Sequence, residues 1–136
     1  MSFENVNLTF PDQRDPALEA LIETYGEKII APAKHMVSRP GDMLDCIYYL
    51  EEGSTQHFIV NADGSEKLLY TLRPGWLFGE TPFYLNLPTN LSSQAKEDSV
   101  LLKLPGKVCR EVLAANPQFV SLLIRCYSYK LLTLRY

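Results

Sequence analysis

The chain has 136 residues, of which 46% are hydrophobic and 21% are charged, and its formal net charge is −3. This length and composition are typical of one globular domain with its own core, and they exclude a disordered tail and a two-domain enzyme. Domains that bind nucleic acids are usually strongly basic, and this chain is not. If DNA is a partner, we therefore expect another part of the protein to bind it.

The cysteines and the N-terminus bear on metal binding and cellular location. Cys46, Cys109 and Cys126 are odd in number, widely spaced and without histidines at metal-ligand spacing, which favours reduced thiols over disulfides or a metal site. The first residues lack the charged and apolar regions of a secretion signal, and no apolar stretch is long enough to cross a membrane. The sequence therefore predicts a cytoplasmic protein with no metal, no cofactor and no membrane contact.

In chain order, residues 1–33 predict an N-terminal helical segment. Asp15, followed by a proline, is a typical helix start. Leu18 and Ile22 lie four positions apart and so share one face of the helix. Gly26 is expected to end it.

Residues 34–104 predict a jelly roll, which is a double-stranded β-helix. Short apolar or alternating runs are separated here by Pro, Gly, Asn and Asp, as in antiparallel sheets. The clearest unit is a hairpin with strands at 56–60 and 67–72, joined by a turn that contains Gly64. The predicted fold class is therefore mainly β with flanking helices, a jelly-roll effector-binding domain followed by a long C-terminal dimerisation helix.

Residues 105–136 predict a short helix and the start of that dimerisation helix. The short helix spans residues 107–115, and Asn116 and Pro117 cap and start the longer helix, which we expect to run to the last residue. This segment carries 5 basic side chains and 1 acidic one, unlike the acidic part of the chain before it. Residues 105–136 are therefore expected to present a more basic surface than the rest of the chain.

The longer helix carries two apolar stripes and one polar line. The first stripe has coiled-coil a/d spacing and contains Val120, Ile124, Tyr127, Leu131 and Leu134. The second stripe contains Phe119, Leu122, Leu123, Cys126 and Tyr129, and the polar line contains Ser121, Arg125, Ser128 and Arg135. Either both stripes are buried within one domain, or the first pairs with its copy in another chain. We favour the pairing, with a helix that continues beyond this chain, because the helix reaches Tyr136 with no capping signal.

Four motifs follow one another in a distinctive order. They are Pro40-Gly41-Asp42, the run from Ile47 to Gly53, Asp63-Gly64, and the run from Pro74 to Glu80. From about residue 34 to its end, the chain resembles the effector domain of the cyclic AMP receptor protein and fumarate-nitrate regulator (Crp/Fnr) family of bacterial transcription regulators. The resemblance implies a homodimeric sensor that binds a small-molecule effector between the β roll and the long helix. In that family a helix-turn-helix DNA-binding domain follows, and it is absent from this chain.

The resemblance also locates a ligand pocket, with one departure. Relatives that bind cyclic nucleotides have a Gly-Glu pair, a short helix, and then an Arg followed by Ser or Thr. Gly79 and Glu80 match the first part, but the Arg and Ser positions fall on Thr89 and Asn90. Because no arginine lies in residues 74–109, a buried cyclic phosphate lacks its counter-charge, and cyclic AMP is not the expected effector.

We expect the pocket to take another ligand, and an aromatic or organic acid suits its uncharged lining. The expected effector-binding residues are Gly79, Glu80, Thr81, Thr89, Asn90, Tyr127 and Leu131. Glu80 has a second interpretation, as an acid that is solvated or paired with a lysine. His35 and His57 have no ligand spacing and no cysteine precedes Cys46, which disfavours haem and iron–sulfur sensing.

Catalysis finds no support in the sequence. There is no Gly-x-Ser-x-Gly motif, no phosphate-binding loop with a lysine and no plausible cysteine–histidine pair, so no catalytic residue is assigned. We predict a non-enzymatic sensor. Two alternatives remain: a stand-alone dimeric cyclic-nucleotide-binding-like adaptor, or a cupin-type enzyme. The cupin is less favoured because its metal site needs several histidines, and this chain has 2.

Overall fold

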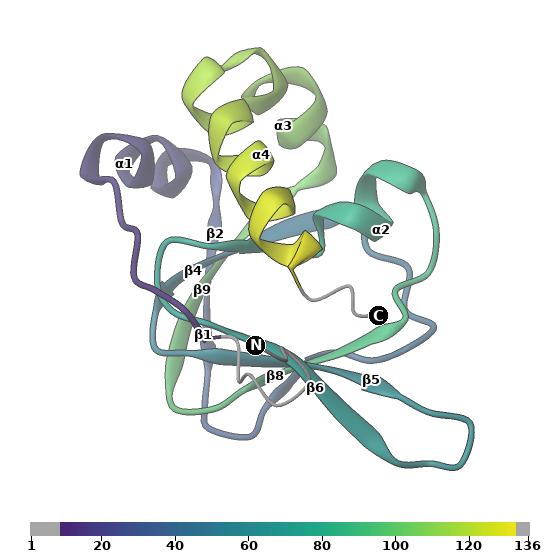
Figure 1. Cartoon of the computed structure of the whole chain (residues 1–136). Coiled ribbons are helices and arrows are strands. Elements are labelled where there is room, and N and C mark those ends of the chain that lie inside the picture. Colours follow the sequence, from purple (N-terminus) through teal and green to yellow (C-terminus); the bar gives the residue numbers. More distant parts are fainter. Residues whose placement is uncertain (1–8, 133–136) are drawn as a thin grey trace.

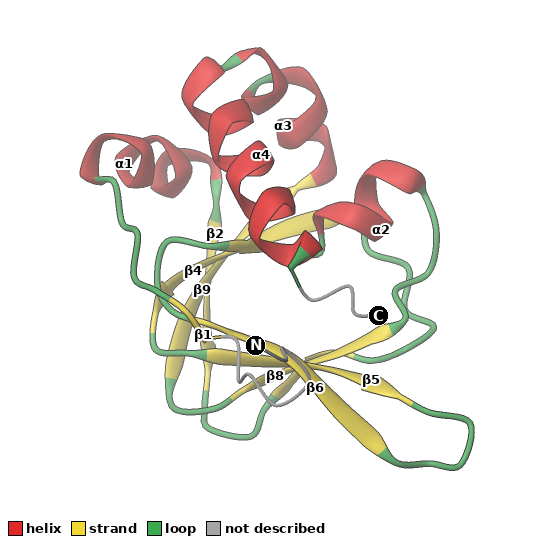
Figure 2. Ribbon diagram, in the orientation of Figure 1, coloured by secondary structure: helices red, strands yellow, loops and turns green. Residues whose placement is uncertain are grey.

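The structure, a computed structural model, describes residues 9–132 (Figures 1 and 2). Its strands are β1 (Thr9–Phe10), β2 (Glu27–Ala31), β3 (Met36–Ser38), β4 (Cys46–Glu52), β5 (Thr55–Val60), β6 (Glu66–Leu72), β7 (Leu77–Phe78), β8 (Leu91–Ala95) and β9 (Ser99–Pro105). Its helices are α1 (Pro16–Tyr25), α2 (Glu80–Leu85), α3 (Gly106–Glu111) and α4 (Pro117–Leu131), with a 3-10 helix at Leu113–Ala115. The described chain is therefore mainly β with flanking helices, as the sequence predicts.

The strands form two sheets that together make the β roll. One sheet has the order β1-β6-β5-β8-β3 and the other has the order β2-β9-β4-β7. Strand β1 runs parallel to β6, and the other pairs are antiparallel. The predicted hairpin is confirmed as β5 and β6, and Figure 1 shows it projecting away from the helices. Pairing between strands distant in sequence, such as β4 with β9, is typical of a jelly roll.

Helix α1 forms where the sequence predicts it. The side chain of Asp15 accepts hydrogen bonds from the backbone N–H groups of Ala17 (3.1 Å) and Leu18 (3.4 Å). At the other end, the N–H of Gly26 donates to the carbonyl oxygen of Ile22 at 2.8 Å. Leu18 and Ile22 are buried, so the predicted apolar face is the one that packs on the sheets.

Two strands lie before residue 34, where the predicted β region starts. Strand β1 pairs with β6, and strand β2 pairs with β9, so both belong to the sheets rather than to a helical segment. Each is short and carries little hydrophobic alternation of its own. Their order comes from hydrogen bonding to a longer neighbour, which a local sequence pattern does not report.

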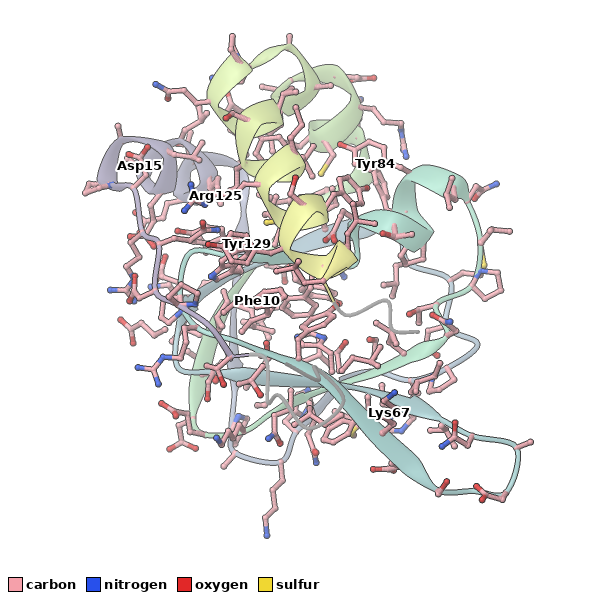
Figure 3. All side chains as sticks on the ribbon, in the orientation of Figure 1. Phe10, Asp15, Lys67, Tyr84, Arg125 and Tyr129 are labelled. Carbon is pink, nitrogen blue, oxygen red and sulfur yellow. The ribbon has the colours of Figure 1, made fainter. Side chains whose placement is uncertain are left out.

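An aromatic cluster joins α4 to the β roll. The ring of Trp76 is fully buried, and its centroid lies 4.9 Å from that of Phe10 and 4.8 Å from that of Tyr129. The indole Nε1 donates a hydrogen bond to the carbonyl oxygen of Pro11 at 2.6 Å. Figure 3 shows Phe10 and Tyr129 close together beneath α4. These contacts fix the C-terminal half of α4 against the sheets.

Helix α4 buries one of its two apolar stripes and exposes the other. In the second stripe Phe119, Leu122, Leu123 and Cys126 are buried, and Tyr129 packs against the core. In the first stripe Ile124 is 61% exposed and Leu131 is 60% exposed, while Val120 and Tyr127 are half-buried. Leu134 lies outside the described residues. Within those residues, the first stripe is therefore not part of this chain's own core.

The start of α4 agrees with its prediction. The side chain of Asn116 accepts a hydrogen bond from the backbone N–H of Phe119 at 2.9 Å, which caps the helix. The predicted short helix before it is α3 followed by the 3-10 helix. The expectation that α4 runs to the end of the chain falls on residues 133–136, outside the part that the structure describes. Across residues 9–132, no helix is both long and apolar enough to span a membrane.

Candidate functional site

Two adjoining hollows lie between the β roll, α2 and the end of α4. The inner pocket, about 50 Å³, is lined by Ser38, Leu44, His57, Tyr70, Phe78, Gly79, Glu80, Thr81, Pro82, Thr89, Leu91, Ser93 and Lys130. The outer groove, about 820 Å³, is lined by Ile59, Leu69, Tyr70, Thr81, Pro82, Leu85, Leu87, Pro88, Thr89, Asn90, Leu91, Tyr127, Lys130 and Leu131. Because six lining residues are common to both, one ligand can extend from the groove into the pocket.

Glu80 enters the inner pocket because the chain turns sharply just before it. Gly79 has a φ of 85°, in the left-handed region that glycine tolerates best. A Cβ atom at this position would also lie 3.2 Å from the Cδ1 atom of Leu44. The turn starts α2 at Glu80 and directs its side chain inward, where 1% of it is exposed.

A buried ion pair joins α2 to α4. The Nζ atom of Lys130 donates hydrogen bonds to Oε1 of Glu80 and to the carbonyl oxygen of Leu77, the latter at 2.8 Å. Nζ also lies 5.6 Å from the centroid of the Tyr70 ring, within cation–π range. Only 13% of the Lys130 side chain is exposed. The end of α4 is therefore held to the pocket by charge as well as by apolar packing.

Lys130 is charged at neutral pH. Burial on its own lowers the pKa of Lys130, but the charge of Glu80, with smaller contributions from Tyr70 and Cys126, more than offsets it. The pKa of Lys130 is therefore raised above its usual value. Burial also raises the pKa of Tyr70 to about 12, so that its hydroxyl stays protonated. Lys130 supplies the positive charge in this pocket, and Glu80 balances it.

His57 is part of the pocket wall and is satisfied by its neighbours. Its Nε2 atom is 2.9 Å from Oγ1 of Thr55, and its Nδ1 atom is 2.9 Å from Oγ of Ser93. Its ring stacks on that of Tyr70 with centroids 4.7 Å apart. Burial, and then the nearby charge of Lys130, lower the pKa of His57 well below its usual value, so the ring is neutral at pH 7. His57 is thus a structural residue.

The structure brings the predicted effector-binding residues together. Gly79, Glu80 and Thr81 line the inner pocket, Thr89 lines both hollows, and Asn90, Tyr127 and Leu131 line the outer groove. These residues come from α2, from the segment before β8 and from α4, which are far apart in the sequence. Their common location agrees with the predicted pocket, and their role in binding stays a prediction.

Thr89 and Asn90, the positions that the resemblance assigns to the Arg and Ser of cyclic-nucleotide-binding relatives, are uncharged. Oγ1 of Thr89 accepts a hydrogen bond from the backbone N–H of Leu91 at 3.2 Å, and the side chain is buried. Asn90 lies at the outer groove. Among the described residues that line the two hollows there is a lysine, Lys130, and no arginine.

Lys130 is the residue that sequence reasoning missed. The predicted polar line of the helix contains Ser121, Arg125, Ser128 and Arg135, and it does not include Lys130. Lys130 follows Cys126 by four positions, so helical spacing places it on the buried stripe. A lysine on a buried helix face requires a nearby anion, and Glu80 was already predicted to be in the pocket. The spacing of Lys130 on the helix and the expected position of Glu80 in the pocket together indicate the ion pair.

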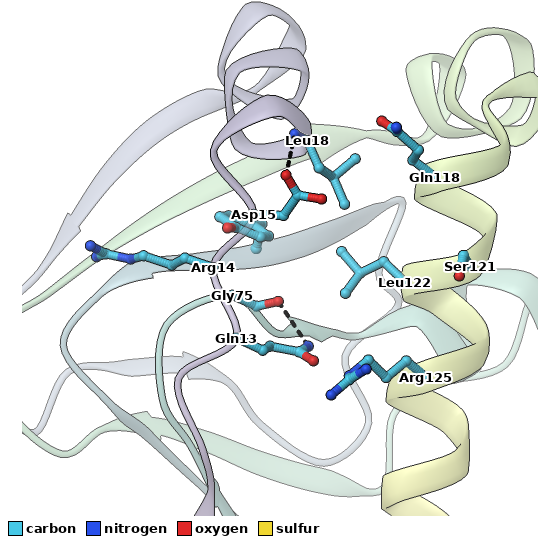
Figure 4. A pocket seen from close by; sticks show the side chains of 10 residues that line it. Gln13, Arg14, Asp15, Leu18, Gly75, Gln118, Ser121, Leu122 and Arg125 are labelled. Atoms are coloured by element: carbon cyan, nitrogen blue, oxygen red, sulfur yellow. Dashed lines mark hydrogen bonds between the residues drawn. The ribbon is translucent and has the colours of Figure 1, made fainter.

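A separate cleft of about 290 Å³ lies between α1 and α4 (Figure 4). It is lined by Gln13, Arg14, Asp15, Leu18, Tyr49, Gly75, Gln118, Ser121, Leu122 and Arg125. Leu18 and Leu122 point toward one another across it, and Nε2 of Gln13 donates to the carbonyl oxygen of Gly75 at 3.1 Å. None of the predicted effector-binding residues lines this cleft. We therefore place the candidate site in the inner pocket and outer groove.

The described residues hold no ready metal site. Across residues 9–132, no three His, Cys, Asp or Glu side chains come together in an arrangement suited to a metal ion. The three cysteines are free and buried, and burial raises the pKa of Cys126 to about 12, which keeps it an unreactive thiol at neutral pH.

Comparison with known proteins places this geometry in context. Residues 29–116 match the family model of the cyclic nucleotide-binding domain. An uncharacterised ABC transporter ATP-binding protein of Mycobacterium bovis is 30% identical over 90 residues, which make up 66% of this chain and 27% of that protein. The chain thus spans a minor part of the length of this curated relative.

Solved structures share the fold over nearly the whole chain. The catabolite activator protein of Thermus thermophilus has a TM-score of 0.75 at 23% identity, with 95% of this chain and 57% of that chain covered. Oxidised CprK in complex with o-chlorophenolacetic acid also has a TM-score of 0.75 at 23% identity, with 94% and 52% covered. At this level of identity the likeness shows the fold alone.

We expect the Lys130→Met variant to lose about 3–5 kcal/mol of unfolding free energy, because it leaves the Glu80 carboxylate buried without its partner. Adding Glu80→Gln to the same chain removes that charge and restores much of the loss. Urea denaturation of both single variants and the double variant measures the coupling between the two side chains. As a control, Arg110→Gln breaks the exposed pair with Asp45 and should cost less than about 1 kcal/mol. Additive losses at positions 80 and 130 would contradict the pairing.

We also expect stability to fall with acidification because of His57. Its folded-state pKa is lowered, so below about pH 6.5 the unfolded chain binds more protons than the folded one. The stabilisation is complete above that pH and declines, by at most about 1.4 kcal/mol per pH unit, as the pH falls toward the folded-state pKa. Urea denaturation at several pH values should give a shallower decline for His57→Gln. The control, His35→Gln at an exposed site, should keep the wild-type slope, and equal slopes for all three proteins would refute this role.

Proposed function

We propose, given that the chain belongs to the cyclic nucleotide-binding domain family, that it is the sensor domain of a Crp/Fnr-type transcription regulator. A small effector other than cyclic AMP binds in the inner pocket and outer groove. A homodimer formed through α4 passes the signal to a DNA-binding domain outside this chain. The observation that carries the proposal is the convergence of Glu80, Thr89 and Tyr127, from three separate segments, on hollows that α4 helps to form.

The similar structures support this proposal through their shared fold and their length. The catabolite activator protein of Thermus thermophilus is an activator by name, and this chain corresponds to 57% of it. CprK, of which this chain covers 52%, was crystallised with a small chlorinated aromatic acid. CprK is thus a protein of shared fold that forms a complex with a small organic ligand. We infer that ligand binding is also the function of the outer groove here.

The effector is proposed to differ from cyclic AMP on electrostatic grounds. Thr89 and Asn90 offer no positive charge at the positions where cyclic-nucleotide-binding relatives have Arg and Ser. Lys130 is already bonded to Glu80 and to the carbonyl oxygen of Leu77. A cyclic phosphate in the pocket therefore has no cation of its own, and burial of an unpaired charge costs several kcal/mol.

The first stripe of α4 is the proposed dimer interface. Ile124 and Leu131 are more than half exposed, and Val120 lies on the same side of the helix. Apolar residues at a/d spacing on the surface of a helix are buried when two such helices form a coiled coil. The second stripe already anchors α4 to the β roll, so pairing through the first stripe does not disturb the sensor domain.

Helix α4 links effector binding to dimerisation. Tyr127 belongs to the proposed interface and also lines the outer groove, and Lys130 reaches the inner pocket from the next turn. A ligand that changes the position of Glu80 or Tyr127 therefore acts directly on α4 and its partner. Effector binding and DNA binding are then coupled reciprocally, as thermodynamic linkage requires.

The sensor is proposed to be non-catalytic. His57 is the natural candidate for a general base in the pocket, but both of its ring nitrogens lie within hydrogen-bonding distance of hydroxyl groups. His57 is bonded to neighbouring hydroxyl groups and Lys130 to Glu80, which fits ligand binding without a reaction.

We predict that the protein sediments as a dimer at micromolar concentration and that Ile124→Glu makes it monomeric. A carboxylate in the centre of the first stripe places like charges against each other across the two-fold axis. Ser128→Glu is the control, because Ser128 is exposed on the polar line of the same helix. This variant should remain dimeric by sedimentation equilibrium. A monomeric wild-type protein would rule out dimerisation through α4.

We further predict that calorimetric titration with cyclic AMP gives no saturable heat. The physical reason is the lack of a cation for the phosphate in the inner pocket. Native mass spectrometry of the freshly purified protein should instead reveal a bound small molecule, which Glu80→Gln or Leu131→Arg reduces. A saturable cyclic AMP isotherm that Glu80→Gln abolishes would sink the effector assignment.

A further inference from the structure

One polar atom in the inner pocket lacks a partner. The Oε2 atom of Glu80 is buried and accepts no hydrogen bond from the described residues, whereas Oε1 of the same carboxylate accepts one from Lys130. Buried polar atoms nearly always have a hydrogen-bond partner. This atom is an acceptor, on a side chain with 1% exposure, in a pocket that continues into a ligand-sized groove. The group that completes it must be a hydrogen-bond donor.

The charges in the two hollows already cancel. Lys130 and Glu80 are the charged residues among the described lining, and they form an ion pair with each other. His57 is neutral because burial and Lys130 lower its pKa. A ligand that enters with a charge of its own therefore leaves that charge uncompensated in a buried site.

The shape of the site separates a small polar end from a large apolar one. The inner pocket, about 50 Å³, holds a group of one or two heavy atoms beside Glu80. The outer groove, about 820 Å³, has side walls that include Ile59, Leu69, Leu91 and Leu131. A ligand that fills both parts has a compact polar head and an aliphatic or aromatic body.

We propose that the effector is an uncharged, largely apolar small molecule whose single hydroxyl or N–H group donates a hydrogen bond to Oε2 of Glu80. This inference rests on the proposed function, because it specifies the ligand of the same site. It departs from the organic acid that the sequence suggested. A carboxylate head brings a second negative charge next to Glu80 and offers no proton to Oε2. An ammonium head supplies a donor but adds a positive charge to that of Lys130.

Four probes with one scaffold test the charge and the donor separately. Phenylpropanol carries the neutral donor, phenylpropanoate the negative charge and phenylpropylamine the positive charge, while the methyl ether of phenylpropanol keeps the oxygen and lacks the proton. Calorimetry near neutral pH measures their affinities for the full chain. Chemical-shift changes in methyl groups of Leu91 and Leu131 show whether each probe occupies the outer groove. We expect the alcohol to bind about tenfold or more tightly than the other three.

Charge-changing variants give the inference its sharpest test. Glu80→Gln removes the negative charge of the ion pair and keeps the positive charge of Lys130, so the preferred probe should change from the alcohol to the carboxylate. In Lys130→Met the pocket retains Glu80 alone, and the amine should become the preferred probe. The matched control is Glu111→Gln, which removes an acidic charge from an exposed site on α3 and should leave the order of the four probes unchanged. Thermal melting by circular dichroism establishes which variants are folded.

Each outcome decides the matter. Preference for the alcohol in the wild-type chain, with the predicted change in Glu80→Gln, supports the inference. If the carboxylate binds best to the wild-type chain in the outer groove, the inference is wrong and the proposed function stands. If no probe binds in the groove, the inference is also wrong, and the co-purifying ligand then decides the proposed function. If either variant fails to fold, the order of the four probes on the wild-type chain is sufficient.

Discussion

The ion pair between Lys130 and Glu80 is the interaction on which the arrangement of the site depends. It connects α2 to α4 inside the pocket, and the bond from Lys130 to the carbonyl oxygen of Leu77 adds β7 to the same contact. A buried charge is energetically costly without its partner. The two side chains therefore hold the end of α4 against the start of α2. Removal of either one affects the shape of the pocket, its charge and the position of α4 together.

The ion pair helps to explain how α4 can pack on the β roll through one stripe and leave the other stripe exposed. The second stripe of α4 packs on the β roll beside Trp76 and Phe10, and the ion pair extends that attachment to the last described turn. The first stripe stays exposed and is available to a partner.

The chemistry of the candidate pocket differs from what the resemblance implies for a cyclic-nucleotide site. An arginine beside the turn of Gly79 would create a positive site for an external anion. Here the cation comes from α4 instead, and it is neutralised inside the protein by Glu80. In the proposed function, the β roll provides the hollow and the charges inside it select the class of ligand.

Local patterns in the sequence predicted most of the elements, and the family resemblance indicated where the candidate site lies. Asp15 and Asn116 predicted helix starts and the residues around Gly64 predicted a hairpin, because caps and turns act over a few residues. Gly79-Glu80 was assigned to the pocket through the resemblance to the family. Strands β1 and β2 and the Lys130–Glu80 pair escaped that analysis. Each depends on a partner that lies 50 or more positions away along the chain. Only the tertiary structure decides which distant groups meet, since burial and charge compensation are properties of the packed molecule rather than of any segment.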